Sequence, residues 1–198
     1  MDTARAETFS DGVFAIAITL LILNVTVHHS GGPLGHDLLR LWPSYLAYAI
    51  SFLTIGIMWV NHHTIFRHIE RVDRTFLLLN LMLLMLVAFV PFPTRIAAQF
   101  ARSDENRRAA AFLYGITLTT TAVFFNSLWL YASRGRRLLA RDADAREVSG
   151  ITRSYIPGAP MYGTATLIAF VNSTASLVLF GAIAVFYALS SSLFGREE

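Results

Sequence analysis

The feature that most constrains this chain is a series of long segments that carry almost no charge. These segments cover residues 9–27, 42–60, 76–94, 109–133 and 154–195, and the only charged side chain among them is Asp11. A helix needs about 20 predominantly apolar residues to cross the hydrocarbon core of a bilayer. The pattern therefore predicts an all-α, polytopic membrane protein.

The last segment, 154–195, is too long for one crossing. As a single helix it would measure about 63 Å, roughly twice the thickness of the hydrocarbon core. A polar break, Asn172-Ser173-Thr174, lies near its middle. We therefore expect two helices here, at about 155–172 and 175–194, and six transmembrane helices per subunit.

The composition agrees with a lipid environment. Hydrophobic residues make up 55% of the chain and charged residues 15%, whereas soluble domains carry about 25% charged residues. The connectors are too short or too polar for a core of their own, and the glycine-rich segment 28–41 is expected to be a loop. We predict one membrane domain over residues 1–198.

The distribution of arginine predicts the orientation. All sixteen basic residues are arginines, and they lie in short stretches between the apolar runs, as topology signals do, so we expect no nucleic-acid partner. Six alternating spans leave eleven arginines on the side of the termini and five on the other. This bias predicts that both termini lie in the cytoplasm, and we expect the protein in the cell inner membrane.

One candidate site is a polar cluster at the cytoplasmic ends of the first two spans. The first span begins with Asp11, and the second ends with Trp59, Asn61, His62 and His63, at a similar depth. A carboxylate there either lies at the interface, where the start of a helix favours an anion, or joins a buried network with these donors. Such a network would fix the first helix against the second.

A second candidate is an apolar stripe along the first span. Ile16, Leu20, Leu23 and Val27 recur at spacings of four, three and four, and Thr19 lies beside them. The stripe is either an ordinary packing face or the lining of a pore between subunits. In the second case, rings of Ile and Leu would close the pore by dewetting, and a ring of threonine hydroxyls would meet the ion.

Several other classes of site find no support in the sequence. There is no TVGYG selectivity filter, no motif of a hydrolase or nucleotide-binding enzyme and no histidine spacing typical of a metal site, so we expect neither an enzyme nor a cofactor. A small ion- or proton-coupled secondary transporter is the alternative to a channel. A transporter usually shows inverted repeats or broken helices at mid-membrane, and neither is evident here.

Specific motifs add a family resemblance. Residues 5–11 (RAETFSD) fit an RxxxFSD pattern that opens a first membrane helix, and the continuation GVFAIAITLLILNV fits as well. The runs Trp59-x-Asn61-His62-His63 and Pro91-Phe-Pro-Thr94 match the same family. The chain resembles the bacterial branch of the endosomal/lysosomal potassium channel family, the transmembrane protein 175 family, over all six spans.

The resemblance implies a potassium-type cation channel that has no P-loop filter and assembles from four copies of a six-helix subunit. It implies that the first helix lines the pore, with Ile16 at the hydrophobic constriction, Leu20 and Leu23 in further apolar rings, and Thr19 in a hydroxyl layer. It further implies a structural network that holds this helix, formed by Arg5, Phe9, Ser10 and Asp11 together with His62 and its neighbours Trp59 and Asn61. The implied permeant ion is potassium.

Overall fold

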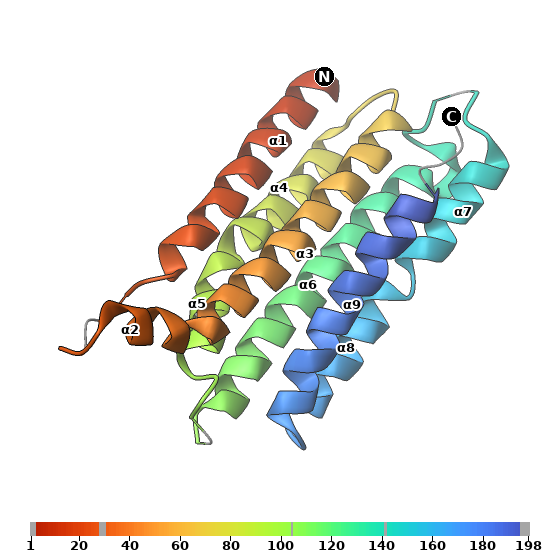
Figure 1. Ribbon diagram of the computed structural model, residues 1–198. Helices are drawn as coiled ribbons and strands as arrows, with labels where there is room; N and C mark the ends of the chain where they lie inside the picture. The colour runs from red at the N-terminus through yellow and green to blue at the C-terminus, as the bar shows by residue number, and fades with distance from the viewer. Residues whose placement is uncertain (1–2, 28–30, 104, 141, 195–198) are drawn as a thin grey trace.

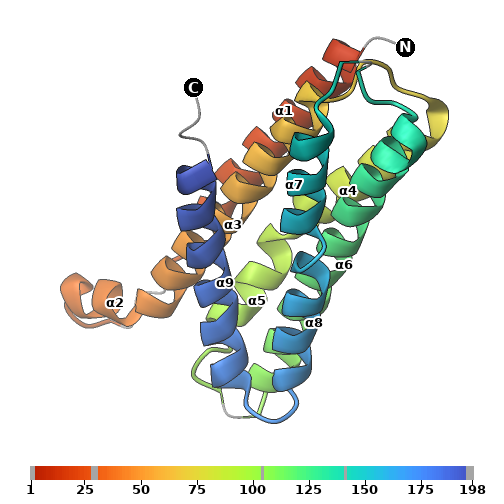
Figure 2. The ribbon, with the colours of Figure 1, turned by 90° about the vertical axis from the view of Figure 1, so that its right-hand side faces the viewer.

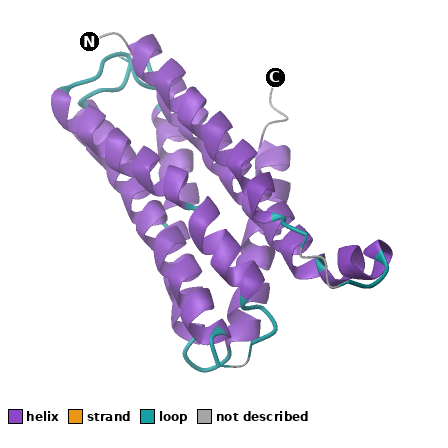
Figure 3. Cartoon of the chain, turned by 90° about the vertical axis from the view of Figure 1, so that its left-hand side faces the viewer, coloured by secondary structure: helices purple, strands orange, loops and turns teal. Residues whose placement is uncertain are grey.

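The computed structural model describes residues 3–27, 31–103, 105–140 and 142–194, with side chains as far as Tyr187. These residues form a bundle of long helices, and the only extended pairing among them is an isolated bridge between Ile69 and Leu139 (Figures 1 and 3). The elements in chain order are α1 (Thr3–Leu20), η1 (Leu21–Asn24), α2 (Leu34–Arg40), α3 (Trp42–Arg67), α4 (Arg74–Phe89), α5 (Pro91–Gln99), α6 (Arg107–Ser133), η2 (Arg134–Arg136), α7 (Ala145–Tyr155), α8 (Gly158–Ile168) and α9 (Ser173–Phe194). The all-α class predicted from the sequence is confirmed.

Four segments have the length and apolar character of a membrane span. They are Thr3–Asn24, Trp42–Arg67, Arg74–Gln99 and Arg107–Arg136, and a shorter apolar helix covers Ser173–Tyr187. The fifth expected span contains the 11-residue helix α8, which follows α7 after a short interruption. The count of six spans therefore remains a prediction.

The longest uncharged run divides where its polar residues indicated. Helix α8 ends at Ile168 and α9 begins at Ser173, and the Asn172 side chain accepts a hydrogen bond from the backbone N–H of Ala175 (3.0 Å). Asparagine in this position satisfies one of the free N–H groups at the start of a helix. The polar residue that interrupts the run thus also starts the next helix.

The third span is broken near its C-terminal end. Helix α4 ends at Phe89 and α5 begins at Pro91, as expected for a proline, which has no N–H to donate within a helix. The expectation that 28–41 is only a loop is wrong, because it contains α2 after Pro33. The first helix also differs from the expected 9–27, since it begins at Thr3 and ends as the 3₁₀ turn η1.

Helix α6 lies at the centre of the bundle and packs against α4, α5, α8 and α9, while α3 packs against α1, α5 and α9. Helix α1 lies at one edge, against α3 and α4 (Figure 1). The first turn of α1 and the last turns of α9 lie at the same end of the bundle (Figures 1 and 2). One face of α1 is therefore left without a partner among the described residues.

Buried hydroxyl groups tie the central helices together. The Ser51 hydroxyl of α3 lies 2.8 Å from the Thr94 hydroxyl of α5 and 3.1 Å from the Tyr114 hydroxyl of α6. Thr94 also donates to the backbone carbonyl of Val90, which lies at the break between α4 and α5. Since buried polar groups are costly unless bonded, this group fixes how α3, α5 and α6 meet.

Candidate ion pathway

Helix α1 has two distinct faces. Ser10, Phe14, Ala17 and Leu21 are buried against α3 and α4, at spacings of four, three and four. The stripe of Ile16, Leu20 and Leu23 points away from the bundle, with exposed fractions of 61%, 41% and 67%. The stripe identified in the sequence is therefore not the face by which α1 packs within the subunit.

Helix α1 ends in a tighter 3₁₀ turn, which is bonded to the start of α5. Residues 21–24 form the 3₁₀ turn η1, where side chains three positions apart lie in one row, so that Leu23 follows Leu20 along the same side. The Asn24 side chain donates to the backbone carbonyl of Pro91 (2.9 Å), at the start of α5. Val27, the last member of the predicted stripe, lies beyond the helix.

Thr19 lies on the exposed side of α1 beside the stripe. Its hydroxyl donates to the backbone carbonyl of Ile16 (2.9 Å). A hydroxyl has one hydrogen to donate and two lone pairs to accept with. Because the hydrogen is engaged within the helix, the oxygen keeps its lone pairs for a donor or a cation outside the subunit.

A buried chain of side chains holds α1 against its neighbours. The Asn80 amide of α4 donates to the Ser10 hydroxyl (3.0 Å), and the Asn80 carbonyl oxygen lies 2.9 Å from Nε2 of His62 on α3. Ser10 donates in turn to the carbonyl of Ala6 (2.8 Å). The His62 ring lies between Phe14 and Phe66, with ring centroids 5.2 and 4.6 Å away.

Asn80 was not among the residues selected from the sequence. The available signal was a single amide in the middle of the otherwise apolar run 76–94, where a polar side chain needs a partner. The sequence brought Ser10 and His62 into one cluster, but it did not indicate that the third span supplies the link between them. The structure connects the first three spans through one buried amide.

The remaining predicted network residues are arranged differently. The Trp59 indole donates to the Asp11 carboxylate (2.9 Å), and His63 lies 3.0 Å from Glu7, so that two partly exposed pairs join α1 to α3. Asp11 thus bonds to Trp59 rather than to His62. Asn61 does not join either pair, because its side chain lines a cavity on the other side of α3.

Arg5 and Phe9 also lie outside the buried chain of hydrogen bonds. Both are exposed at the start of α1, Phe9 with 57% of its surface free. Phe9 lies seven residues, about two turns, before Ile16 and so shares the outward side of the helix. Their part in the network therefore stays a prediction.

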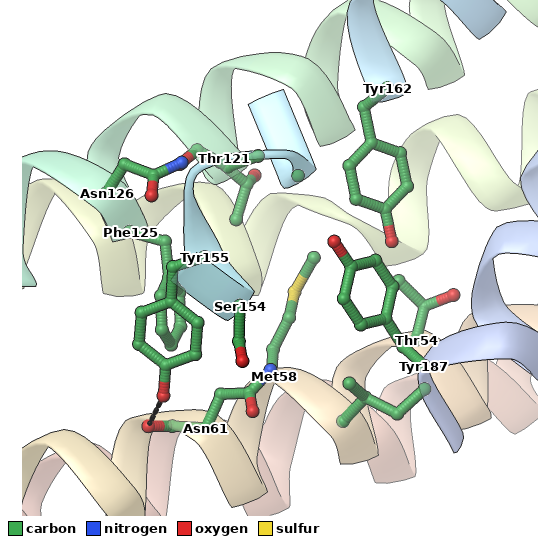
Figure 4. Close-up of a pocket in the computed structure, with 13 residues that line it drawn as sticks. Thr54, Met58, Asn61, Thr121, Phe125, Asn126, Ser154, Tyr155, Tyr162 and Tyr187 are labelled. Carbon is green, nitrogen blue, oxygen red and sulfur yellow. Dashed lines mark hydrogen bonds between the residues drawn. The ribbon is translucent and has the colours of Figure 1, made fainter. Parts of the chain in front are cut away.

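The subunit contains a small cavity, about 60 Å³ in volume (Figure 4). Residues of α3, α6, α7, α8 and α9 line it, including Thr54, Asn126, Tyr155 and Tyr187, and none of the lining side chains is charged. The volume is enough for roughly four water molecules. The cavity thus has no charged side chain that would balance the charge of an ion, and the described residues contain no cluster of His, Asp and Glu suited to a metal.

Comparisons with known proteins agree with the motifs. Residues 5–91 match the family described as endosomal/lysosomal potassium channel TMEM175. A potassium channel of Streptomyces collinus is 43% identical over 94% of this chain and 91% of its own length, and one of Chamaesiphon minutus is 45% identical over 96% of each. The crystal structure of a lysosomal potassium-selective channel TMEM175 homolog from Chamaesiphon minutus superimposes with a TM-score of 0.87 at 41% identity, covering 96% of this chain and 97% of that one.

Proposed function

This chain belongs to the TMEM175 potassium channel family, and from that premise we propose that it is the subunit of a potassium-conducting cation channel whose pore is lined by α1. The relatives are channels and not enzymes, which agrees with the expectation from the sequence. Potassium is the proposed permeant ion. The proposed assembly is a homotetramer in a lipid bilayer, with the four α1 helices around its axis.

One observation carries the proposal for α1: its outward side is apolar and free, while its inward side is fixed. Ile16 and Leu23 expose about two thirds of their surface, yet Ser10 on the opposite side is fully buried. The exposed stripe of α1 would line a pathway that forms between copies of the chain. A helix held rigidly on one side and free on the other suits a pore wall.

The side chains on the free face suit the passage of a weakly hydrated cation. Rings of Ile16, Leu20 and Leu23 would give a narrow apolar stretch from which water retreats, and this stretch would limit conduction. A ring of Thr19 oxygens next to Ile16 would supply lone pairs in place of lost water. We propose Ile16 as the constriction and Thr19 as the polar layer.

The remaining features of the proposal concern the whole subunit. Residues 1–198 form a single membrane domain that crosses the bilayer six times. Both termini lie in the cytoplasm, as the arginine bias predicts, and the protein resides in the cell inner membrane. Ser10 and His62 hold α1 in place through Asn80, and Asp11 and Trp59 add a second attachment.

The test is ion flux through purified protein in planar bilayers. Ile16→Asn should raise the current, because a ring of asparagine side chains lets water and ions enter the constriction even while the pore is closed. Ile22→Asn is a matched control, since Ile22 is also more than half exposed, belongs to the adjoining turn and points to a different side. An unchanged current in Ile16→Asn would reject this constriction.

The same bilayers separate a channel from a coupled transporter. Under opposing potassium and sodium gradients, a potassium-type channel sets a reversal potential near that of potassium and needs no coupling ion. A current that vanished without a proton gradient would favour the transporter instead. The reversal potential also measures how strongly potassium is preferred.

A further inference from the structure

Two loops at the end of the bundle where α1 begins are joined by backbone hydrogen bonds. The N–H of Glu70 donates to the carbonyl of Leu138 (3.0 Å), and the N–H of Ala140 donates to the carbonyl of His68 (3.1 Å). Ile69 and Leu139 form the bridge between them and are buried. The junction is therefore a built part of the fold rather than two separate surface loops.

A pocket of about 280 Å³ lies at this junction. It is lined by Glu70, Arg71, Arg136, Leu139 and Ala140. Two arginines and one glutamate thus lie around the pocket, and Leu139 and Ala140 belong to the strand-like junction at its base. The charged residues of the lining give the pocket a net positive charge.

The two arginines are held in position by the backbone around them. Nη2 of Arg71 donates to the carbonyl of Arg137 (3.3 Å), and Nη2 of Arg136 donates to the carbonyl of Ala143. A guanidinium has five N–H donors in a fixed fork, so each arginine keeps several donors after this contact. Arginine forks of this kind match the oxygens of a phosphate.

The neighbouring Arg137 is engaged elsewhere. Its Nε lies 3.6 Å from Asp73, and its guanidinium lies over the ring of Tyr131 at 5.0 Å. The pKa of the Asp73 carboxyl is lowered, chiefly by the hydrogen bond from the N–H of Phe76 and further by the Tyr131 hydroxyl and Arg137. Asp73 stays ionised and retains Arg137, which leaves Arg71 and Arg136 as the cations of the pocket.

Arg136 also occupies an unusual backbone conformation. Its φ is +55°, directly after Gly135 at +61°. A left-handed conformation is easy for glycine and unfavourable for a long side chain. Strain of this kind persists where the surroundings enforce it, often at a ligand site.

The pocket lies at the level of the lipid headgroups. Helix α3 ends at Arg67 and α4 begins at Arg74, so the loop between them lies just outside two membrane spans. Tyr131 lies between one and two turns before Arg136 and is partly exposed, and tyrosine gathers at the interface between lipid and water. Basic pockets at the ends of membrane helices are suited to lipid headgroups.

We propose that this pocket binds the phosphate group of an anionic glycerophospholipid. Arg71 and Arg136 hold the phosphate, and the chains of the lipid extend from the pocket into the adjoining bilayer. The Thr3 hydroxyl donates to the carbonyl of Glu70 (3.3 Å), so the pocket also contacts the first residue of α1. Building on the proposed channel function, a bound lipid steadies the start of the pore helix.

The experiment measures lipid binding directly by native mass spectrometry of the detergent-purified assembly. The probe is 1-palmitoyl-2-oleoyl-phosphatidylglycerol, with the phosphatidylcholine of the same chains as reference. The wild type should retain phosphatidylglycerol preferentially. The double substitution Arg71→Gln with Arg136→Gln should weaken this retention roughly thirtyfold, since each arginine near an anionic lipid contributes about fivefold.

Two single variants serve as controls. Arg136→Gly removes the charge but suits the backbone conformation, so it should lose lipid while unfolding no more readily than the wild type. Arg108→Gln removes an arginine at the opposite end of the bundle and should keep the lipid preference. Equal losses in Arg108→Gln and Arg136→Gly would overturn the proposal in favour of diffuse charge attraction.

A third arm tests for a soluble anion. Inorganic phosphate at millimolar concentration should not displace phosphatidylglycerol from the wild type. Displacement by phosphate would overturn the lipid assignment and identify a soluble-anion site. The lipid experiment measures binding and not ion flux. A negative result would therefore overturn the lipid site alone, and the channel function is tested separately by the bilayer currents.

Discussion

At the scale of single residues, Asn80 has the largest expected effect on how α1 is held. It bonds to Ser10 and His62 and is itself buried. Asn80→Leu keeps the branched shape of the side chain but leaves both partners without this bond, at a cost of about 1–3 kcal/mol for each buried group. We expect a lower melting temperature of the purified assembly, followed by tryptophan fluorescence.

Asp11 provides the comparison for this prediction. Asp11→Ala removes one hydrogen bond, from Trp59, at a partly exposed position. It should lower the melting temperature less than Asn80→Leu. If Asp11→Ala were the more damaging change, the attachment of α1 would depend on the exposed pairs and not on the buried amide.

These residues also show what a sequence can indicate about a site. Ser10 and His62 could be assigned to one cluster because their spans begin and end on the same side of the membrane. Their link through Asn80 depends on which spans are neighbours, and hydropathy does not encode adjacency. Asn61 was included for its position in sequence, but its place on the helix turns it toward the opposite side of α3.

At the scale of helices, the close approach of α6 to α8 and α9 depends on Gly115. A Cβ atom there would lie 2.5 Å from the Thr166 hydroxyl and 2.7 Å from Phe180. Both neighbours are buried and have little room to move. Gly115→Ala should therefore destabilise the bundle by about 1–3 kcal/mol, as overpacked cores do.

The measurement is again the melting temperature, with Gly56→Ala as the control. A Cβ at Gly56 would meet nothing within 4 Å, and alanine is the better helix former in the middle of α3. Gly56→Ala should thus be neutral or stabilising. Equal melting temperatures for the two variants would mean that α6 does not approach α8 as closely as described.

The helices themselves were largely predictable, because crossing a bilayer requires long apolar runs. The proline break before α5 and the polar break before α9 were visible as local exceptions to those runs. Helix α2 was missed, since a short helix outside the membrane has no length requirement and lies in a glycine-rich segment. The 3₁₀ turn at 21–24 was missed because apolar periodicity alone does not distinguish it from the end of an α-helix.

At the scale of the whole molecule, the sequence left two readings of the Ile16 stripe open. The subunit removes part of that ambiguity, since the stripe is not how α1 packs within the chain. Contact with lipid and contact with a pore would both leave apolar side chains exposed in one subunit. A test therefore has to ask whether water reaches the stripe in the assembled protein.

The absence of cysteine from the sequence makes such a test clean. Leu23→Cys and Leu167→Cys introduce the same side chain at two positions with the same exposed fraction, 67%, on η1 and on α8. A thiol reacts as a thiolate, which forms in water and not in lipid. A cationic methanethiosulfonate reagent should therefore modify Leu23→Cys and reduce the potassium current, while the current of Leu167→Cys stays unchanged. If Leu167→Cys were blocked and Leu23→Cys spared, the pore would lie beside α8, and α1 would face the lipid.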